Sequence, residues 1–242
     1  MRVLVACEYS GVVRDAFIAR GHDAVSCDLL PTEKPGPHYQ GDVRDILDGM
    51  PCGTYRGEDF CDLSSRDKEM ANQGIIDEDL QPWDLLIAHP DCTYITSSAE
   101  WAYGDGPYHQ KVKPETLVGA ARRAAREDAL DFVRLLLAAP IHMKCIENPA
   151  RGAINNRIRK PDQIIQPNQF GHDASKATGL WLEGLPHLVP TCIIPPRMVG
   201  TLPRWANQTD SGQNKLTPGK DRWKERARTY QGWADAMADQ WG

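Results

Sequence analysis

The chain has 242 residues, of which 41% are hydrophobic and 25% are charged, and its formal net charge is -5. This length suits one globular domain with a small lobe. No apolar run reaches the roughly 18 residues that a membrane helix needs, and the first residues lack the basic start and cleavage site of a signal peptide. These features exclude a membrane-spanning or secreted protein, and we expect a soluble protein of the cytoplasm.

Cysteine content and charge distribution narrow the class further. The seven cysteines form no C-x-x-C pair, so neither a disulfide framework nor a metal site is expected, and most thiols should be buried. Residues 41–84 hold twelve acidic and four basic side chains, whereas residues 143–228 hold fourteen basic and seven acidic ones. A basic face on an acidic protein is therefore compatible with nucleic-acid binding.

The first half of the chain alternates apolar runs with turn residues. The pattern predicts strands at 2–6 and 23–27, a helix from Val12 that stops at Gly21, and a third strand ending near 41–43. Residues 51–82 are polar and Asp-rich, which indicates a surface insertion with one possible helix. The buried strand 84–88 should stop at Pro90, because proline cannot continue a central ladder.

The second half begins with the longest predicted helix, residues 114–139. Pro114 suits its first turn, and its apolar face is expected to contain Leu117, Ala121, Ala124, Val133 and Leu137, opposite Arg122, Arg123 and Arg126. Further strands are predicted at 141–146, 164–165 and 180–182, a proline-rich coil at 186–203, and a closing helix at 232–240. Strands that alternate with helices predict an α/β fold with a doubly wound, mainly parallel sheet.

Polar residues follow four of the predicted strands. Ligands of open parallel sheets bind beyond the carboxyl ends of the strands, where the sequence places Glu8–Gly11, Asp28, Gly41-Asp42 and His89–Cys92. The first of these is a small-residue turn of the kind that lets a nucleotide cofactor approach the backbone, and Asp28 is placed to bind ribose hydroxyls. Because G-x-G-x-x-G is absent, an ordinary β-α turn with a solvated aspartate remains an alternative.

Cys92 and Glu147 each follow a predicted buried strand. Backbone N–H groups near Cys92 are expected to give the thiol some thiolate character, and a carboxyl group at the adjacent strand end suits addition of sulfur to a nitrogen-containing ring. The alternative is a buried structural cysteine and a capping glutamate.

The order of these motifs resembles the DNA cytosine-5 methyltransferase family, particularly its short phage and prophage members. Glu8-Tyr9-Ser10-Gly11 stands at the family's cofactor loop, and His89-Pro90-Asp91-Cys92 and Glu147-Asn148-Pro149 stand at its Pro-Pro-Cys and Glu-Asn-Val motifs. The resemblance implies a Rossmann-like fold that binds S-adenosylmethionine, in a bacterium or a phage-infected host cell. The cofactor-binding residues that it implies are Glu8, Tyr9, Ser10, Gly11, Asp28, Leu29, Asp42, Val43 and Pro90.

By the same resemblance, Cys92 attacks carbon 6 of a flipped-out cytosine, Glu147 holds the N3 edge, and carbon 5 receives the methyl group. Lys176 lies in the segment that resembles the family's Gln-x-Arg-x-Arg, where Ala174 and Thr178 replace the other two side chains, and Arg157 or Arg159 could compensate. Asp91 replaces the second proline of the nucleophile motif. Its carboxylate should oppose thiolate formation at Cys92.

The C-terminal part is shorter than in typical members of that family. We expect a core at 1–187, a short basic DNA-contacting region at 188–227, and a segment at 228–242 that returns to the core, so that the C-terminal lobe is small or vestigial. A solvated basic loop and helix is the alternative for the basic region. The DNA-binding residues that the resemblance implies are Arg151, Arg157, Arg159, Arg204, Lys215 and Arg222.

Several activities remain open at this point. The donor could instead be carboxy-S-adenosylmethionine, which would transfer a carboxymethyl group to the same carbon. An exocyclic amino methyltransferase and a catalytically inactive nucleic-acid-binding protein are the other candidates. The expected partner is DNA, without a membrane, and the protein is expected to be a monomer or a homodimer.

Overall fold

The computed structural model describes residues 1–51, 80–217, 219 and 222–242. Most of the predicted insertion at 51–82, with its possible helix, lies outside the described residues, as do Cys52 and Cys61. At the edges of that region β4 (Met50–Pro51) pairs antiparallel with β5 (Leu80–Gln81). Among the described residues, the helices are all too short or too polar to cross a membrane.

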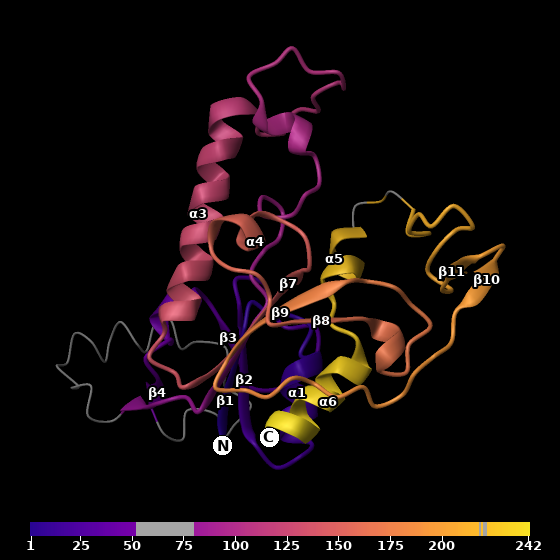
Figure 1. The fold of residues 1–242 in the computed structure, drawn as a ribbon. Coiled ribbons are helices and arrows are strands. Elements are labelled where there is room, and N and C mark those ends of the chain that lie inside the picture. The colour runs from indigo at the N-terminus through magenta and orange to yellow at the C-terminus, as the bar shows by residue number, and fades with distance from the viewer. Residues whose placement is uncertain (52–79, 218, 220–221) are drawn as a thin grey trace.

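A seven-stranded sheet forms the centre of the fold, in the order β3-β2-β1-β6-β7-β9-β8 (Figure 1). Its first five strands run parallel, and β9 is antiparallel to both of its neighbours. The strands are β1 (Arg2–Ala6), β2 (Asp23–Asp28), β3 (His38–Gln40), β6 (Leu85–Ala88), β7 (Met143–Pro149), β8 (Gln163–Ile165) and β9 (Thr178–Glu183). The predicted α/β fold with a mainly parallel sheet is confirmed, and it is consistent with a Rossmann-like architecture.

Helices cover both faces of this sheet (Figure 1). One face packs against α1 (Val12–Ile18) and α6 (Gln231–Trp241), and the other against α3 (Gly119–Ala138) and α4 (Ala153–Arg157). Alternate residues of each strand enter the two cores, since Val3 and Val5 pack on the α1 side while Leu4 packs on the α3 side. The sheet is therefore doubly wound.

The long helix differs from its prediction in its start and in its buried face. It begins at Gly119 rather than at Pro114, and Ala121 and Ala124 are exposed. Arg122, expected in solvent, is 7% exposed, because the segment from Tyr94 to Tyr103 covers the arginine face of the helix. Aromatic rings of that segment lie against the guanidinium groups of Arg122 and Arg126. The predicted apolar face is therefore wrong for the first turns of the helix, whereas Val133 is buried in the core and Leu137 packs against it, as predicted.

A small C-terminal lobe accompanies the sheet. It contains β10 (Arg197–Val199), β11 (Leu202–Arg204) and α5 (Arg222–Ala227). Outside this lobe, the described 3-10 turns include η1 (Val43–Asp45), η4 (Glu100–Tyr103) and η5 (Pro167–Gln169). The prediction of coil throughout 186–203 is wrong for β10 and for the first part of β11. The two strands form a hairpin outside the main sheet, in which Pro203 is tolerated because each strand has only one partner.

Candidate active site

The carboxyl ends of the parallel strands meet at one edge of the sheet. The chain proceeds from β1 outward to β2 and β3 and then returns to β6 on the other side of β1, so the strand order reverses between β1 and β6. The loops after these two strands contain Glu8–Gly11 and His89–Cys92, and the amide of His89 donates to the carbonyl of Ala6 at 3.0 Å. Such a reversal point is where open α/β sheets bind ligands.

The loop after β1 is closed by its own glutamate. The Glu8 carboxylate is 4% exposed and accepts hydrogen bonds from the amides of Val13 at 2.7 Å and Arg14 at 3.2 Å, and from the Ser10 hydroxyl at 3.2 Å. It therefore caps α1, and the side chains of Glu8 and Ser10 are used within the protein. Any contact between these two residues and a cofactor is left to their backbone atoms, and their predicted role stays a prediction.

Gly11 is required by the geometry of this turn. It has φ of 70°, and a Cβ atom there would lie 2.5 Å from a terminal nitrogen of Arg14. Side chains rarely adopt this left-handed conformation, and the contact removes any space for one. Residue 11 therefore has no side chain at the start of α1, where Arg14 fills the space beside it.

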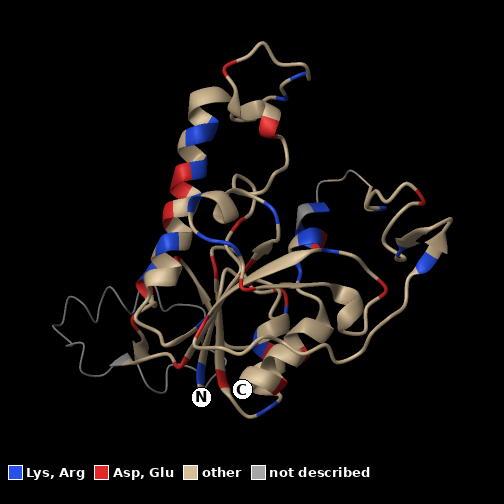
Figure 2. Ribbon diagram, in the orientation of Figure 1, with Lys and Arg blue, Asp and Glu red and all other residues tan. Residues whose placement is uncertain are grey.

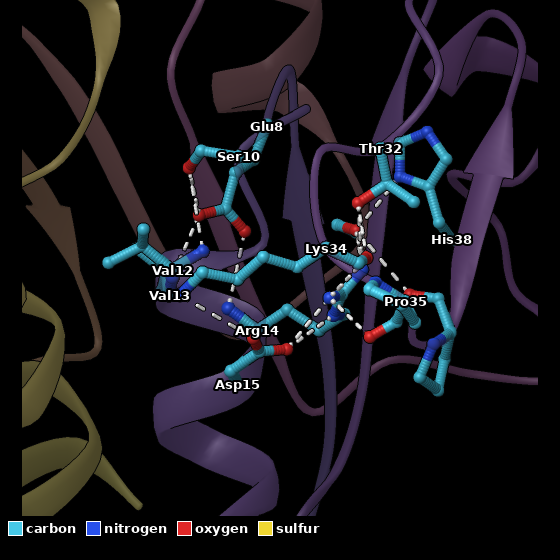
Figure 3. A network of polar contacts seen from close by, with 12 residues as sticks. Glu8, Ser10, Val12, Val13, Arg14, Asp15, Thr32, Lys34, Pro35 and His38 are labelled. Atoms are coloured by element: carbon cyan, nitrogen blue, oxygen red, sulfur yellow. Dashed lines mark hydrogen bonds and ion pairs between the residues drawn. The ribbon is translucent and has the colours of Figure 1, made fainter.

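Arg14 is a residue whose role sequence reasoning missed. Its guanidinium group is completely buried and hydrogen-bonds Ser26, Thr32, Asp15 and the carbonyl groups of Lys34 and Pro35 (Figure 3). These partners fix the loop between β2 and β3 against α1. An arginine inside an amphipathic helix reads as a solvated residue, so the sequence carries no signal for this network.

Asp28 ends β2 under the loop that Arg14 holds. Burial raises the pKa of its carboxyl group, while hydrogen bonds from the amides of Leu30 and Leu29 and the nearby His89 act in the opposite sense. Leu29 is 72% exposed next to it. A carboxylate beside an exposed apolar side chain suits a ligand that carries both hydroxyl groups and a flat ring.

The next two predicted cofactor-binding residues, Asp42 and Val43, have different environments. Asp42 caps η1 by accepting hydrogen bonds from the amide and guanidinium groups of Arg44, both at 3.0 Å. Val43 is 4% exposed and packs in the core, so its side chain faces away from any ligand. Pro90 is likewise buried, and its carbonyl accepts a hydrogen bond from Asn148 at 2.8 Å.

Tyr9 and the start of the C-terminal segment close over this edge. The Tyr9 hydroxyl donates to the carbonyl of Lys224 in α5 at 3.0 Å, and the Tyr9 carbonyl accepts from the amide of Glu33 at 2.8 Å. Glu33 in turn binds Arg228 through both carboxylate oxygens, at 2.8 and 3.0 Å. Arg228, the first residue of the segment predicted to return to the core, thus contacts the loop between β2 and β3.

The ends of β6 and β7, which form the second half of this edge, bring together the three residues predicted to be catalytic. Cys92 follows β6, and Glu147 lies inside β7, which runs three residues further than predicted. Lys176 precedes β9 and acts electrostatically on both Cys92 and Glu147. Ala88 pairs with Ile146 in the sheet, so the two strand ends are direct neighbours.

Glu147 is buried but charged. Burial by itself would raise its pKa, yet Lys176, a hydrogen bond from His89 and a hydrogen bond from Thr178 together hold the pKa below its usual value. The distance from His89 Nδ1 to Glu147 Oε2 is 2.9 Å. His89 and Thr178 were not predicted to contribute, although His89 stands inside the quoted motif.

Cys92 is a thiol in this environment. Burial raises its pKa, Asp91 and Glu147 raise it further, and Lys176 and Arg226 act in the opposite sense. The expected thiolate character is therefore wrong for the protein without ligands, whereas the expected effect of Asp91 has the right sign. Besides Lys176, the cation that lowers the pKa of Cys92 is Arg226 of α5. Arg157 and Arg159, which were expected to compensate for the replaced arginines, pair with Glu127 and Asp162 instead.

Basic residues occur on both α3 and α5 (Figure 2). Arg151 is exposed close behind Glu147 in the chain, whereas Arg159 is engaged by Asp162 and by the carbonyl of Leu182, away from Cys92 in the fold. Arg204 donates to carbonyl groups of its own lobe, and Lys215 is exposed there. Arg222 lies in α5, with a buried Nε that has no partner among the described residues.

The remaining cysteines show no pairing. Cys7, Cys27, Cys92, Cys145 and Cys192 are all free thiols, and Cys192 is exposed rather than buried. Burial, with Asp28, Asp42 and Asp91 nearby, raises the pKa of Cys7 to about 12. Within the described part of the chain, no group of histidine, cysteine and acidic side chains is arranged to hold a metal ion.

The geometry thus defines an α/β protein with a candidate ligand-binding edge, called the ligand edge below. It is made of the closed turn after β1, the half-buried Asp28 after β2, and the group of Cys92, Glu147 and Lys176. Compared with the models of known protein families and with curated proteins, the chain matches none.

Proposed function

We propose that the protein transfers a methyl group from S-adenosylmethionine to carbon 5 of cytosine in DNA, through a covalent bond between Cys92 and the base. The observation that carries this proposal is the meeting of Cys92, Glu147 and Lys176 at neighbouring strand ends, beside the reversal point of the sheet. A nucleophile, a buried carboxylate and a cation in one place suit addition to an electron-poor ring.

The residues at the ends of β1 and β2 fit the nucleoside half of the cofactor. Asp28 offers a carboxylate for ribose hydroxyls, exposed Leu29 offers an apolar surface for the adenine ring, and the turn at Gly11 allows close approach. Glu8 already occupies the start of α1, so the carboxylate of the methionine half has to bind elsewhere. When bound, S-adenosylmethionine supplies the methyl group.

Cys92 and Glu147 have complementary tasks in this reaction. The Cys92 sulfur bonds to carbon 6, its thiol proton passes through solvent to N3 of the ring, and the ring's electron pair becomes available at carbon 5. The Glu147 carboxylate accepts hydrogen bonds from the N3–H formed in this way and from the amino group of the base. Carbon 5 then gains the methyl group and loses its proton to solvent, the bond from sulfur to carbon 6 breaks, and the N3 proton returns to sulfur, which restores the Cys92 thiol.

Trapping on 5-fluorocytosine DNA tests the proposal directly. With fluorine at carbon 5 there is no proton to lose, so the protein should remain attached to the DNA under denaturing conditions when the cofactor is present. Cys92→Ala should abolish this adduct, while Cys192→Ala, which removes an exposed thiol, should retain it. Trapping that survives in Cys92→Ala contradicts the assignment of the nucleophile.

Mass spectrometry of nucleosides from treated DNA identifies the group transferred. With each donor offered separately, 5-methylcytosine supports S-adenosylmethionine and 5-carboxymethylcytosine supports carboxy-S-adenosylmethionine. A methyl group on the exocyclic nitrogen would indicate the amino methyltransferase alternative.

One observation favours a second candidate, a nucleic-acid-binding protein without turnover. The environment of Cys92 keeps it a thiol in the absence of ligands, and Asp91 contributes to this. This candidate predicts DNA binding whose affinity falls with salt and no modified nucleoside with either donor. Any measured transfer eliminates it.

A further inference from the structure

A pocket of about 470 Å³ lies beside the candidate active site, between the loops that follow Cys92 and Glu147. Its walls come from the segment after Cys92, from α3 and from α4. The side chains that matter for its chemistry are Ser97, Glu100, Arg126, Arg151, Asn156 and Arg157.

The two site loops are joined under this pocket. Thr96 and Gly152 form an antiparallel bridge, and the amide of Ala153 donates to the carbonyl of Ile95 at 2.6 Å. A Cβ atom at residue 152 would lie 2.1 Å from that carbonyl oxygen, so only glycine permits the contact. The pocket is therefore held in a fixed position relative to Cys92 and Glu147.

The charge of the pocket is positive. Arg126 is satisfied by Glu100 at 2.6 Å and by the carbonyl of Tyr94, and Arg157 is paired with Glu127 at 3.1 Å. Arg151 is exposed, and in the described part of the chain no hydrogen bond or ion pair engages its guanidinium group. Its five N–H donors are thus available for an anion with several oxygen atoms.

We propose that this pocket binds a backbone phosphate of the strand that carries the target cytosine, with Arg151 as its main ligand. The inference rests on the proposed function, because a nucleotide turned out of a duplex brings its flanking phosphates with it to the site. Arg151 follows Glu147 by four residues, and Ser97 follows Cys92 by five. Phosphate contacts of this kind fix the register of the strand and carry no sequence code.

The test is the salt dependence of DNA binding by Arg151→Gln. The probe is a fluorescein-labelled 20-base-pair duplex containing several cytosines, and the same labelled strand alone. Loss of one phosphate contact should reduce the slope of log affinity against log salt by about 1, and weaken binding about fivefold at 0.15 M salt. The matched control is Arg134→Gln on α3, which removes an exposed arginine paired with Asp131 and should leave the slope unchanged.

The possible outcomes distinguish failure of the pocket proposal from failure of the proposed function. An unchanged slope in Arg151→Gln overturns the pocket proposal, and so does an equal reduction in both variants, which would indicate only a general effect of charge. If the wild type binds DNA, Arg151→Gln lowers the slope, and neither donor yields a modified nucleoside, the pocket proposal stands and the proposed function fails. A larger effect of Arg151→Gln on the single strand than on the duplex would assign the phosphate to an unpaired strand.

Discussion

The two halves of the ligand edge are built in different ways. At the ends of β1 and β2, charged side chains serve the fold: Glu8 caps a helix and Arg14 holds a loop through its partners. At the ends of β6 and β7, charged side chains act on one another, as Lys176 does on Cys92 and Glu147. The first half is a fixed surface, and the second holds titratable groups whose protonation depends on their neighbours.

This difference suits a division between cofactor and base. A surface that approaches a nucleoside needs backbone at the right place and little free charge, which the closed turn at Gly11 provides. A surface that attacks a ring needs groups poised between two protonation states. Substitutions in the first half should therefore affect stability, and substitutions in the second should affect reactivity.

Glu147→Gln should give the largest effect on reactivity. The amide keeps the shape but cannot balance the charge that develops on the base, so the rate of transfer should fall about 100-fold or more. Single-turnover measurements with saturating DNA isolate this step. Because the substitution also removes the buried carboxylate that is hydrogen-bonded to His89, the unfolding transition of the variant should be recorded at the same pH. A rate within threefold of the wild type would remove Glu147 from the reaction.

Arg14→Met should give the largest effect on stability. The substitution removes every hydrogen bond that the buried guanidinium group donates, although Ser26 keeps His38 and the Lys34 carbonyl keeps Thr32 as partners. We expect a loss of about 3 kcal/mol in the free energy of unfolding. Urea denaturation measures it. The matched control is Arg20→Met in the turn just after the same helix, which breaks surface ion pairs with Asp235 and Asp239 and should cost less than about 1 kcal/mol. Equal losses would show that the network contributes no more than surface pairing.

The sequence predicted the strands better than the environment of the site. Short β-branched runs such as residues 2–6 can only be buried strands in this context, and their spacing predicted the parallel sheet. Cys92 and Glu147 were found because each follows or ends such a strand. The same reasoning could not give the low pKa of Glu147, because it depends on Lys176 and Thr178, about thirty residues away.

Helix faces and roles of charged residues were the weakest predictions. Three arginines on one face of residues 119–138 indicate a solvated face, but Tyr94 and Tyr103 lie over Arg122. This packing depends on where the segment after Cys92 travels, which no local pattern specifies. The cap by Glu8, in contrast, joins residues only five and six apart, so a local reading could have found it.

Two opposite substitutions probe the electrostatic balance at Cys92. Asp91→Asn removes a carboxylate that raises the pKa of Cys92, and Lys176→Met removes a cation that lowers it. Alkylation of Cys92 by iodoacetamide, followed by peptide mass spectrometry from pH 6 to 10, should be faster than in the wild type in the first variant and slower in the second. Cys192 on the same molecules provides the reference rate. Shifts in the same direction would mean that packing, and not charge, governs the thiol.

The smallest expected effect is on the pH dependence of stability, which should have opposite signs for a carboxyl group in each half of the edge. The pKa of Glu147 is lowered, so its contribution to stability is present above the unfolded value of about 4.3 and is lost as pH falls through the folded pKa. The pKa of Asp28 is raised by burial, so its ionisation makes the folded state less stable as pH rises through the unfolded and then the folded value. Unfolding free energies of Glu147→Gln and Asp28→Asn, each subtracted from the wild type between pH 3 and 7, should therefore change in opposite directions. Parallel curves would mean that both carboxyl groups have the same environment, and the distinction between a fixed half and a reactive half would no longer hold.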